Sequence, residues 1–272
     1  MQPHVPRAMT IAGSDSGGGA GIQADLKTFA ALGVFGASAI TALTAQNTRG
    51  VAGIHPVPPE FIGLQIAAVL DDIGADAVKT GMLATREIVL AVTRAVERYA
   101  IKNLVVDPVH VSKHGAPLLD DDALDAYVNT LLPNALIVTP NVPEAERLAG
   151  LKIADREGLR QAARAIARLG PRYVLIKGGH LADADSSTDL LYDGRDFEEL
   201  TSPRIATPHT HGTGCVLSAA IAAYLALGRP PAEAVARAKA FVTRAIEHSL
   251  AIGGGIGPVN PLWEKMSSHI RS

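Results

Sequence analysis

Short apolar runs alternate with longer amphipathic stretches along most of the chain, and this alternation predicts strands and helices in turn. The first run covers residues 8–12, a glycine-rich loop follows it, and residues 22–32 then show helical spacing of apolar positions. Repetition of this unit is typical of α/β proteins with a parallel sheet. We expect strands at 8–12, 36–45, 51–57, 75–79, 103–106, 135–139 and 173–177, and a hairpin formed by 189–194 and 197–205.

Local signals at several helix ends support the same order of elements. Pro59 and Glu60 occupy the first turn of a helix that ends near residue 70, and both residue types are favoured in that turn. Thr85 is a suitable cap for the next helix, because its hydroxyl can accept from a backbone N–H. Pro231 begins an amphipathic helix near the end of the chain.

Composition favours the same architecture. The chain has 272 residues, of which 47% are hydrophobic and only 4% aromatic, so the core consists mainly of Ala, Val, Ile and Leu. Such a core suits buried parallel strands covered by helices. The length suffices for one large domain, and no internal repeat or low-complexity linker divides it. We therefore expect a single α/β domain over 1–272, with a central, mostly parallel sheet flanked by helices on both faces.

Charge and cysteine usage narrow the partners and the compartment. The formal net charge is −2 and no basic stripe occurs, which argues against nucleic acid as the main partner. No apolar run reaches membrane-spanning length, and the first residues do not have a signal-peptide pattern. A single cysteine excludes an internal disulfide and indicates a reducing, cytoplasmic compartment.

The glycine-rich loop at 13–21 lies between a strand and a helix, which is the usual setting of a nucleotide-binding loop. A P-loop requires a lysine directly after its glycines, and none follows them here. Residues 19–24 fit the looser dinucleotide pattern, but that fold also needs an acidic residue about 20 positions later. No Asp or Glu occurs between Leu26 and Pro59, so we exclude dinucleotide binding.

Notable side chains follow many of the predicted strands, at the end of the sheet where ligands of open α/β folds bind. We therefore expect one cleft there. Asn141 and Glu144 have the spacing of a capping box, and the same pair also suits a metal–phosphate group; the residues alone leave both interpretations open. Three acids at 120–122 are interpreted as helix-opening residues that favour the helix dipole. The strand-end residues are Asp15, Gln46, Met82, Asp107, Asn141 and Lys177.

Residues 209–215 form a turn of small residues that leads into an alanine-rich helix and contains Cys215. If the helix starts near Thr213, its unpaired N–H groups and positive dipole end form a site for an anion such as phosphate. The same position would lower the pKa of the thiol and favour thiolate. A buried structural cysteine is the alternative, since free cysteine is among the most buried residue types.

Blocks at 13–28, 41–48, 79–83, 107–109, 139–145, 177–180 and 211–215 resemble, in the same order, those of the hydroxymethylpyrimidine/phosphomethylpyrimidine kinases of thiamine biosynthesis. The match runs from about residue 9 to residue 262. This resemblance implies a ribokinase-like fold with a minimal flap over the site, and a homodimer. It also implies phosphorylation of 4-amino-5-hydroxymethyl-2-methylpyrimidine by ATP with Mg²⁺, and then of its monophosphate to the diphosphate.

The resemblance assigns roles to residues at matching positions. Asp107 and Glu144 are implied to hold Mg²⁺ through coordinated water. Cys215 stands where sugar kinases of this fold have an aspartate base, so a thiolate there could take the hydroxyl proton of the substrate. The implied pyrimidine contacts are Gly13, Asp25, Gln46, Met82 and Val109, the ATP contacts are Lys177, Asn141 and Thr210, and the catalytic anion hole comprises Gly212, Thr213, Gly214 and Cys215.

Two segments depart from the family pattern. The flap has His110, His114 and Ala116 where relatives usually have Met, a residue other than His, and Asp. Residues 253–258 lack the histidines often seen there. We interpret the two flap histidines as solvated loop residues.

Two other functions compete with the pyrimidine kinase. A pyridoxal or pyridoxine kinase on the same fold phosphorylates a similar hydroxymethyl group, but relatives of that type with Cys at the anion hole carry a second Cys in the flap, and this chain has one. A non-catalytic sensor of pyrimidines would be expected to lose the Mg²⁺ residues or Cys215, and all are present.

Overall fold

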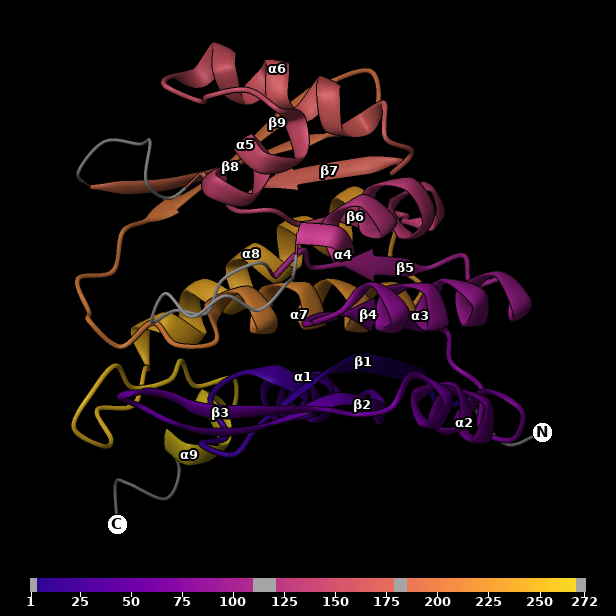
Figure 1. Cartoon of the computed structure of the whole chain (residues 1–272). Helices are drawn as coiled ribbons and strands as arrows, with labels where there is room; N and C mark the ends of the chain where they lie inside the picture. The colour runs from indigo at the N-terminus through magenta and orange to yellow at the C-terminus, as the bar shows by residue number, and fades with distance from the viewer. Residues whose placement is uncertain (1–3, 110–120, 179–184, 268–272) are drawn as a thin grey trace.

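The computed structural model describes residues 4–109, 121–178 and 185–267 (Figure 1). These residues form a nine-stranded sheet of order β3-β2-β1-β4-β5-β6-β7-β8-β9. The strands are β1 (Arg7–Asp15), β2 (Phe35–Asn47), β3 (Gly50–Pro56), β4 (Ala77–Thr80), β5 (Leu104–Val106), β6 (Ile137–Val138), β7 (Tyr173–Ile176), β8 (Ser186–Tyr192) and β9 (Phe197–Pro203). The helices are α1 (Gly21–Ala31), α2 (Pro59–Leu70), α3 (Arg86–Arg98), α4 (Asp121–Ala126), α5 (Val142–Ala149), α6 (Arg156–Ala167), α7 (Thr213–Ala226), α8 (Pro231–Glu247) and α9 (Trp263–Ser267).

The six central strands of the sheet, in the order β2, β1, β4, β5, β6 and β7, run parallel to one another. Antiparallel strands flank them, with β3 at one edge and the β8–β9 hairpin at the other. The expected α/β class with a mostly parallel sheet is confirmed. Because six strands point the same way, the segments that follow them meet at one end of the sheet.

Helices cover both faces of the sheet, as expected. In one apolar cluster α2, α3, α4, α5 and α6 pack on the strands, and in the other α1, α7 and α8 do so (Figure 1). Successive strand residues serve opposite clusters: Ala77 belongs to the α7 side and Val78 to the α3 side. This is the alternation that a strand buried on both faces requires.

Helix α7 lies in the middle of its layer and is buried nearly all round, from Val216 to Ala226 with the exception of Tyr224. It packs against α1, α8 and the central strands, which explains why its sequence is rich in alanine and has no polar face. Its first turn is thereby placed beneath the carboxyl ends of the strands. Ser218 in its second turn donates to Oδ2 of Asp107 at 3.1 Å, tying the helix to β5.

Two elements differ from the sequence prediction. The second strand continues through Gln46 and Asn47 and turns back as β3, because Oδ1 of Asn47 accepts from the N–H of Arg49 at 2.8 Å and closes a tight turn. Gln46 therefore lies in a hairpin arm and not after a parallel strand. Helix α4 continues as a π-helical turn (Tyr127–Leu131) and a 3₁₀ turn (Leu132–Asn134), which periodicity did not predict.

Some expectations fall on residues outside those the structure describes: the flap with His110, His114 and Ala116, the first acid of the 120–122 run, and His180. In the described part of the chain, the helices are too short or too polar to cross a membrane.

Candidate active site

A cavity of about 1150 Å³ opens at the carboxyl ends of the parallel strands. One end of it is lined by residues of β1, β2 and β4, among them Gly13, Gln46 and Met82. The other end lies between the β8–β9 hairpin and α8, where Ile205 and Val242 contribute apolar surface. The expected cleft is therefore present, and it is large enough to hold two ligands end to end. The predicted site residues that line it are Gly13, Gln46, Met82, Val109, Asp107, Asn141, Glu144, Lys177, Thr210, Gly212, Thr213, Gly214 and Cys215.

A lysine and two carboxylates meet at the middle of this cavity. Nζ of Lys177 lies 3.1 Å from Oδ1 of Asp107 and 3.8 Å from Oε2 of Glu144. The Lys177 side chain is 18% exposed, so its ammonium remains accessible from the cavity. Burial alone would raise the pKa of Asp107, but the charges of Lys177 and Lys79 outweigh it and lower that pKa. Asp107 is therefore ionised at neutral pH.

Asn141 and Glu144 form the capping box of α5. Oδ1 of Asn141 accepts from the N–H of Glu144 at 2.9 Å, and Oε2 of Glu144 accepts from the N–H of Asn141 at 2.8 Å. The same Glu144 oxygen faces Lys177, so the box holds a carboxylate at the cavity wall. The capping-box interpretation is confirmed, and the metal–phosphate interpretation stays a prediction.

The carboxylates fit a cation held through water better than one bound directly. Asp107 already accepts from Lys177, Thr139 and Ser218, and Glu144 accepts from Asn141. Among the described residues, no three His, Cys, Asp or Glu side chains cluster as a complete metal cage. Mg²⁺ typically keeps several waters and binds through one or two carboxylates plus substrate phosphates, which this donor set suits.

The turn before α7 lies against the charged group. Gly214 is so close that a Cβ there would be 3.4 Å from Nζ of Lys177 and 3.7 Å from Oδ2 of Asp107. Gly212, the N-cap of α7, has φ of +80°, and a Cβ there would be 1.8 Å from the carbonyl oxygen of Gly19. Glycine is thus required at this position. Because the N-cap lacks a side chain, no side chain caps the first turn, whose N–H groups suit an anion.

The expected low pKa of Cys215 is wrong for this structure. Burial raises the pKa of the thiol to about 11, and the carboxylates of Asp25 and Asp107 add to the effect. The ammonium of Lys79 and the N–H of Gly21 act in the opposite direction but are weaker. The thiol is consequently protonated at neutral pH in the ligand-free site, because desolvation outweighs the helix dipole.

Asp25 does not line the cavity, contrary to the direct pyrimidine contact expected of it. Its side chain is fully buried, and Oδ2 accepts from Nζ of Lys79 at 2.8 Å and from Oγ1 of Thr10 at 2.6 Å. Lys79 is equally buried but does line the cavity floor. Sequence reasoning assigned no role to Lys79, although a lysine directly after Ala77 and Val78 in a short strand was a usable signal.

Gln46 belongs to a cluster that joins three distant segments. Nε2 of His211 lies 2.9 Å from Oδ2 of Asp15 and 3.4 Å from Nε2 of Gln46. The carboxylate of Asp15 also accepts from the N–H groups of Gly17, Gly19 and Ala20, and so organises the glycine-rich loop. His211 was quoted in the family block but was given no role of its own.

Residues 253–255, which lack the family's histidines, pack against the tip of the β2–β3 hairpin. The N–H of Gly255 donates to Oγ1 of Thr48 at 3.3 Å, and the N–H of Ile256 donates to the Thr48 carbonyl at 2.8 Å. A Cβ on Gly255 would be 2.1 Å from that carbonyl oxygen. The glycines therefore allow a close contact that holds the hairpin arm carrying Gln46.

A second missed group lies at the end of the cavity beside α8. Nζ of Lys239 on α8 lies 2.8 Å from Oδ2 of Asp189 on β8, and both side chains are largely buried. Lys239 falls on the helix face that also presents Val235 and Val242, and a lysine within an apolar face was a signal for it.

The chain is similar to known proteins along most of its length. The phosphomethylpyrimidine kinase family model matches residues 15–260. The chain is 55% identical over 252 residues to the thiamine biosynthesis bifunctional protein ThiED of Geobacter sulfurreducens, covering 93% of this chain and 51% of that protein. It is 48% identical over 264 residues to the hydroxymethylpyrimidine/phosphomethylpyrimidine kinase of Bacillus subtilis, covering 97% of both chains.

The solved structure of an ADP complex of Bacillus subtilis pyridoxal kinase superposes with a TM-score of 0.89 at 38% identity, covering 97% of this chain and 100% of that chain. This likeness confirms the expected ribokinase-like fold. The chain therefore spans about half of the bifunctional relative and nearly all of the other two proteins.

Proposed function

The chain belongs to the phosphomethylpyrimidine kinase family, and we propose that it transfers the terminal phosphoryl group of ATP to 4-amino-5-hydroxymethyl-2-methylpyrimidine and then to the resulting monophosphate. One observation carries the proposal: the Lys177–Asp107–Glu144 group and the α7 turn lie between the polar end of one cavity, which holds Gln46, and the end beside Ile205 and Val242. That is the arrangement a kinase needs for two substrates. The whole activity is assigned to a single domain over 1–272.

The polar end suits the pyrimidine ring. The amide of Gln46 can donate to a ring nitrogen and accept from the exocyclic amine. Met82 supplies an apolar surface, and its carbonyl is held by Oγ1 of Thr41 at 2.7 Å. Gly13 allows close approach there, since a Cβ would be 3.2 Å from Sδ of Met82. Val109 lines the same end. Asp25 acts on this site only through Lys79.

The end beside Ile205 and Val242 suits the adenosine portion of ATP, with the phosphates directed at Lys177 and the α7 turn. The hydroxymethyl oxygen attacks the terminal phosphorus, an O–P bond forms, and the bond from that phosphorus to ADP breaks. Lys177 and the N–H groups of residues 213–215 neutralise charge on the transferred group. Asn141 and Thr210 are placed at the cavity wall to contact the nucleotide. In the second reaction an oxygen of the monophosphate is the nucleophile.

Asp107 and Glu144 would hold Mg²⁺ through water at the junction of the two substrates. The ion, when bound, neutralises the phosphates and orients them. Cys215 is proposed as the acceptor of the hydroxyl proton. Because the pKa of its thiol is raised to about 11, Cys215 must first lose its own proton to solvent, and the charge of the Lys79 ammonium favours that loss.

The test is product formation by the purified protein with Mg-ATP and, in turn, the pyrimidine alcohol, its monophosphate and pyridoxal. Formation of the pyrimidine diphosphate from the monophosphate supports the proposal. Absence of turnover together with tight binding of the pyrimidine would favour a non-catalytic sensor and contradict the proposal.

A pyridoxal kinase is the second candidate, because the structural relative with a TM-score of 0.89 is named as one. Its substrate also presents a ring hydroxymethyl group to phosphate. This chain has a single cysteine, at position 215, whereas the pyridoxal-phosphorylating relatives with a cysteine at this position carry another in the flap. Turnover of pyridoxal alone in the same assay would make this second candidate the answer.

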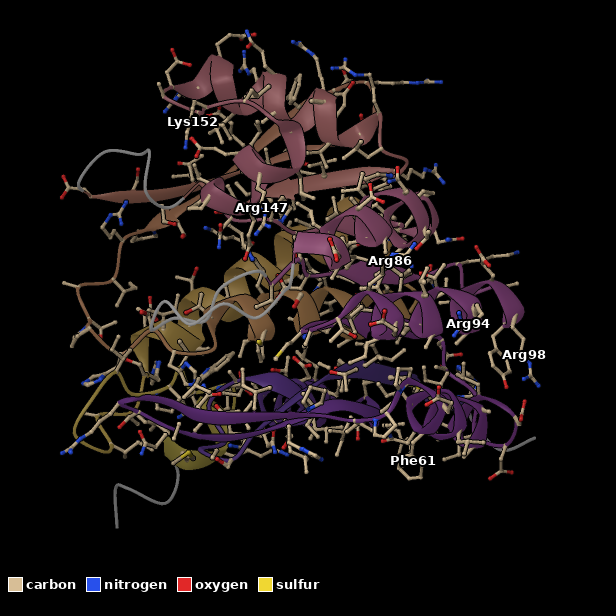
Figure 2. All side chains as sticks on the ribbon, in the orientation of Figure 1. Phe61, Arg86, Arg94, Arg98, Arg147 and Lys152 are labelled. Carbon is tan, nitrogen blue, oxygen red and sulfur yellow. The ribbon has the colours of Figure 1, made fainter. Side chains whose placement is uncertain are left out.

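We also propose that the protein is a cytoplasmic homodimer without nucleic-acid or membrane partners. Large apolar side chains are exposed near the β3 edge: Phe61 is 56% and Leu64 64% exposed on α2, and Leu43 is 49% exposed on β2. Phe61 projects outward from α2 (Figure 2). A second copy would cover this surface. Phe61→Glu with Leu64→Glu should convert the dimer to monomer in sedimentation, while a wild-type protein that sediments as a monomer would contradict the proposal.

A further inference from the structure

Four polar side chains at the ring end of the cavity form one hydrogen-bonded cluster: Asp15, Thr44, Gln46 and His211. Nε2 of His211 lies 2.9 Å from Oδ2 of Asp15 and 3.4 Å from Nε2 of Gln46. Oγ1 of Thr44 lies 2.9 Å from the carbonyl oxygen of Ser14 and 3.2 Å from Oε1 of Gln46. The number of protons in this cluster limits which of these contacts can form together.

The contact between Asp15 and His211 determines where one proton lies. Burial alone would raise the pKa of Asp15, but hydrogen bonds from His211, Gly17 and Ala20 outweigh it and lower that pKa. The carboxylate is therefore ionised at neutral pH and can only accept hydrogen bonds. Nε2 of His211 must consequently carry a proton and donate it to Asp15.

The hydroxyl of Thr44 determines the hydrogen bonding on the other side of the Gln46 amide. It has one proton, and the shorter of its two contacts is with the carbonyl of Ser14, which can only accept. Toward Gln46 the hydroxyl thus presents a lone pair. When the Gln46 oxygen faces Thr44, two acceptors meet, the amide oxygen and the hydroxyl lone pair. When the Gln46 nitrogen faces His211, two donors meet, the amide N–H and the Nε2 proton.

Rotation of the Gln46 amide by half a turn removes both conflicts. The amide oxygen and nitrogen occupy nearly the same space, so the hydrogen-bonding partners decide which atom lies where. After rotation, the oxygen accepts from the Nε2 proton of His211, which it shares with Asp15, and the nitrogen donates to Thr44. Both contacts of the Gln46 amide are then hydrogen bonds between a donor and an acceptor.

The imidazole is held in place by its surroundings. A Cβ on Gly19 would be 2.5 Å from Cδ2 of His211, so this loop packs directly on the ring. The backbone of His211 is bonded on both sides to the C-terminal loop, through its N–H to Gly257 at 3.1 Å and through its carbonyl to Val259 at 3.0 Å. The proton on Nε2 therefore points in a defined direction.

We propose that His211 is a specificity-determining positioning residue, which orients the Gln46 amide so that its oxygen faces the exocyclic amine of an aminopyrimidine and its nitrogen faces the adjacent ring nitrogen. The inference rests on the proposed function and names the feature of the substrate that is read. A ring without the amine leaves the Gln46 oxygen without that donor, and the enzyme discriminates against it.

The test is a double-mutant cycle with His211→Leu and Gln46→Ala, measured as kcat/KM for the aminopyrimidine alcohol and for the same alcohol lacking the amine. His211→Leu should lower kcat/KM about tenfold for the amine-bearing ring and little for the other. In the Gln46→Ala background it should cause no further loss. His211→Gln, whose amide nitrogen reaches the position of Nε2, should restore the discrimination.

Additive losses in the cycle, or equal losses on both alcohols, would overturn the proposal and leave His211 a structural residue. ¹⁵N NMR of the histidine-labelled wild-type protein tests the arrangement without turnover: a protonated Nε2 is expected, and a bare Nε2 contradicts it. If wild-type protein phosphorylates neither alcohol while Nε2 is protonated, the proposed function fails and the hydrogen-bonded arrangement stands.

Discussion

Two lysine–aspartate pairs lie at the carboxyl ends of the strands, and they differ mainly in their access to the cavity. Lys79 and Asp25 are both 0% exposed at a separation of 2.8 Å. Lys177 and Asp107 are 3.1 Å apart, with Lys177 18% exposed. The first pair has its charges matched to each other inside the protein, whereas in the second the ammonium can still reach a ligand.

The difference shows how similar groups come to serve different purposes. Burial alone would lower the pKa of Lys79, but the carboxylate of Asp25 outweighs it and raises that pKa, so the lysine stays charged inside the core. The charge of Lys79 lowers the pKa of Cys215, against the effect of burial. Lys177 also stays charged, held by Asp107 and Glu144 against the effect of burial, but it is directed into the cavity. We call Lys79–Asp25 the closed pair and Lys177–Asp107 the open pair. We infer that the closed pair shifts the pKa of Cys215, whereas the open pair contacts the ligands.

Removal of the closed pair's lysine should have the largest effect, and it should be an effect on stability. Lys79→Met leaves the buried carboxylate of Asp25 without its cation, which costs about 3–5 kcal/mol in comparable sites. The free energy of unfolding from urea titration measures this loss. Lys79→Met combined with Asp25→Leu should recover most of it, because both charges are then gone.

An exposed pair provides the control for this prediction. Lys152 lies 2.9 Å from Glu146 and is 91% exposed at the surface (Figure 2). Lys152→Met should cost less than about 1 kcal/mol, as exposed ion pairs do. If the two lysine variants lost the same stability, the contrast between closed and exposed pairs would be wrong.

Removal of the open pair's lysine should instead affect catalysis. Lys177→Met should lower kcat by about 100- to 1000-fold, the range found when one charge-stabilising donor is removed from an active site. Its stability should change less than that of Lys79→Met, because the ammonium is partly solvated. Lys177→Arg keeps the charge but changes its geometry, and should retain an intermediate rate. A normal kcat in Lys177→Met would remove this residue from the proposed mechanism.

Residues of both pairs shift the pKa of Cys215, and the pH dependence of turnover tests the role of this thiol. The pKa of the thiol is about 11, so the thiolate fraction rises about tenfold per pH unit between pH 7 and 9. If the thiolate accepts the substrate proton, log kcat/KM, which reports the free enzyme, should rise with pH over that window in the wild type. Cys215→Ser should be about 100-fold slower at pH 8, with a flat profile. Equal rates and equal profiles would mean that Cys215 is not the base.

Features with local signals could be read from the sequence. Thr85 caps α3 through the N–H of Ile88, and Asn141 caps α5, as their spacing predicted. The candidate site was located because parallel strands bring their carboxyl ends together, and this depends only on the order of strands and helices. The roles of the site residues remain predictions.

The ion pairs of the site could not be read from the sequence, because they join segments that are far apart along the chain. Lys79 and Asp25 are 54 residues apart in sequence, and His211 and Asp15 are 196 apart. No periodicity encodes such pairs. The sequence left two interpretations of Cys215 open, and the raised pKa in the structure agrees with the buried cysteine and not with the activated thiol.

The smallest effect is expected at Asn141, which lies beside the open pair. Its variants distinguish capping of α5 from ligand binding. Asn141→Ala removes the acceptor for the N–H of Glu144 and should cost about 1 kcal/mol of unfolding free energy. Asn141→Ser restores a capping oxygen and should recover most of that stability, but it does not restore the longer amide that faces the cavity.

The proposed contact of Asn141 with ATP predicts that both variants raise the KM for ATP, whatever their stability. If Asn141→Ser recovers both the stability and the KM, the residue acts only by capping α5 and holding Glu144 beside Lys177. If it recovers the stability alone, the amide itself binds nucleotide. The two interpretations of this capping box, which the sequence could not separate, are thereby distinguished by one matched pair of variants.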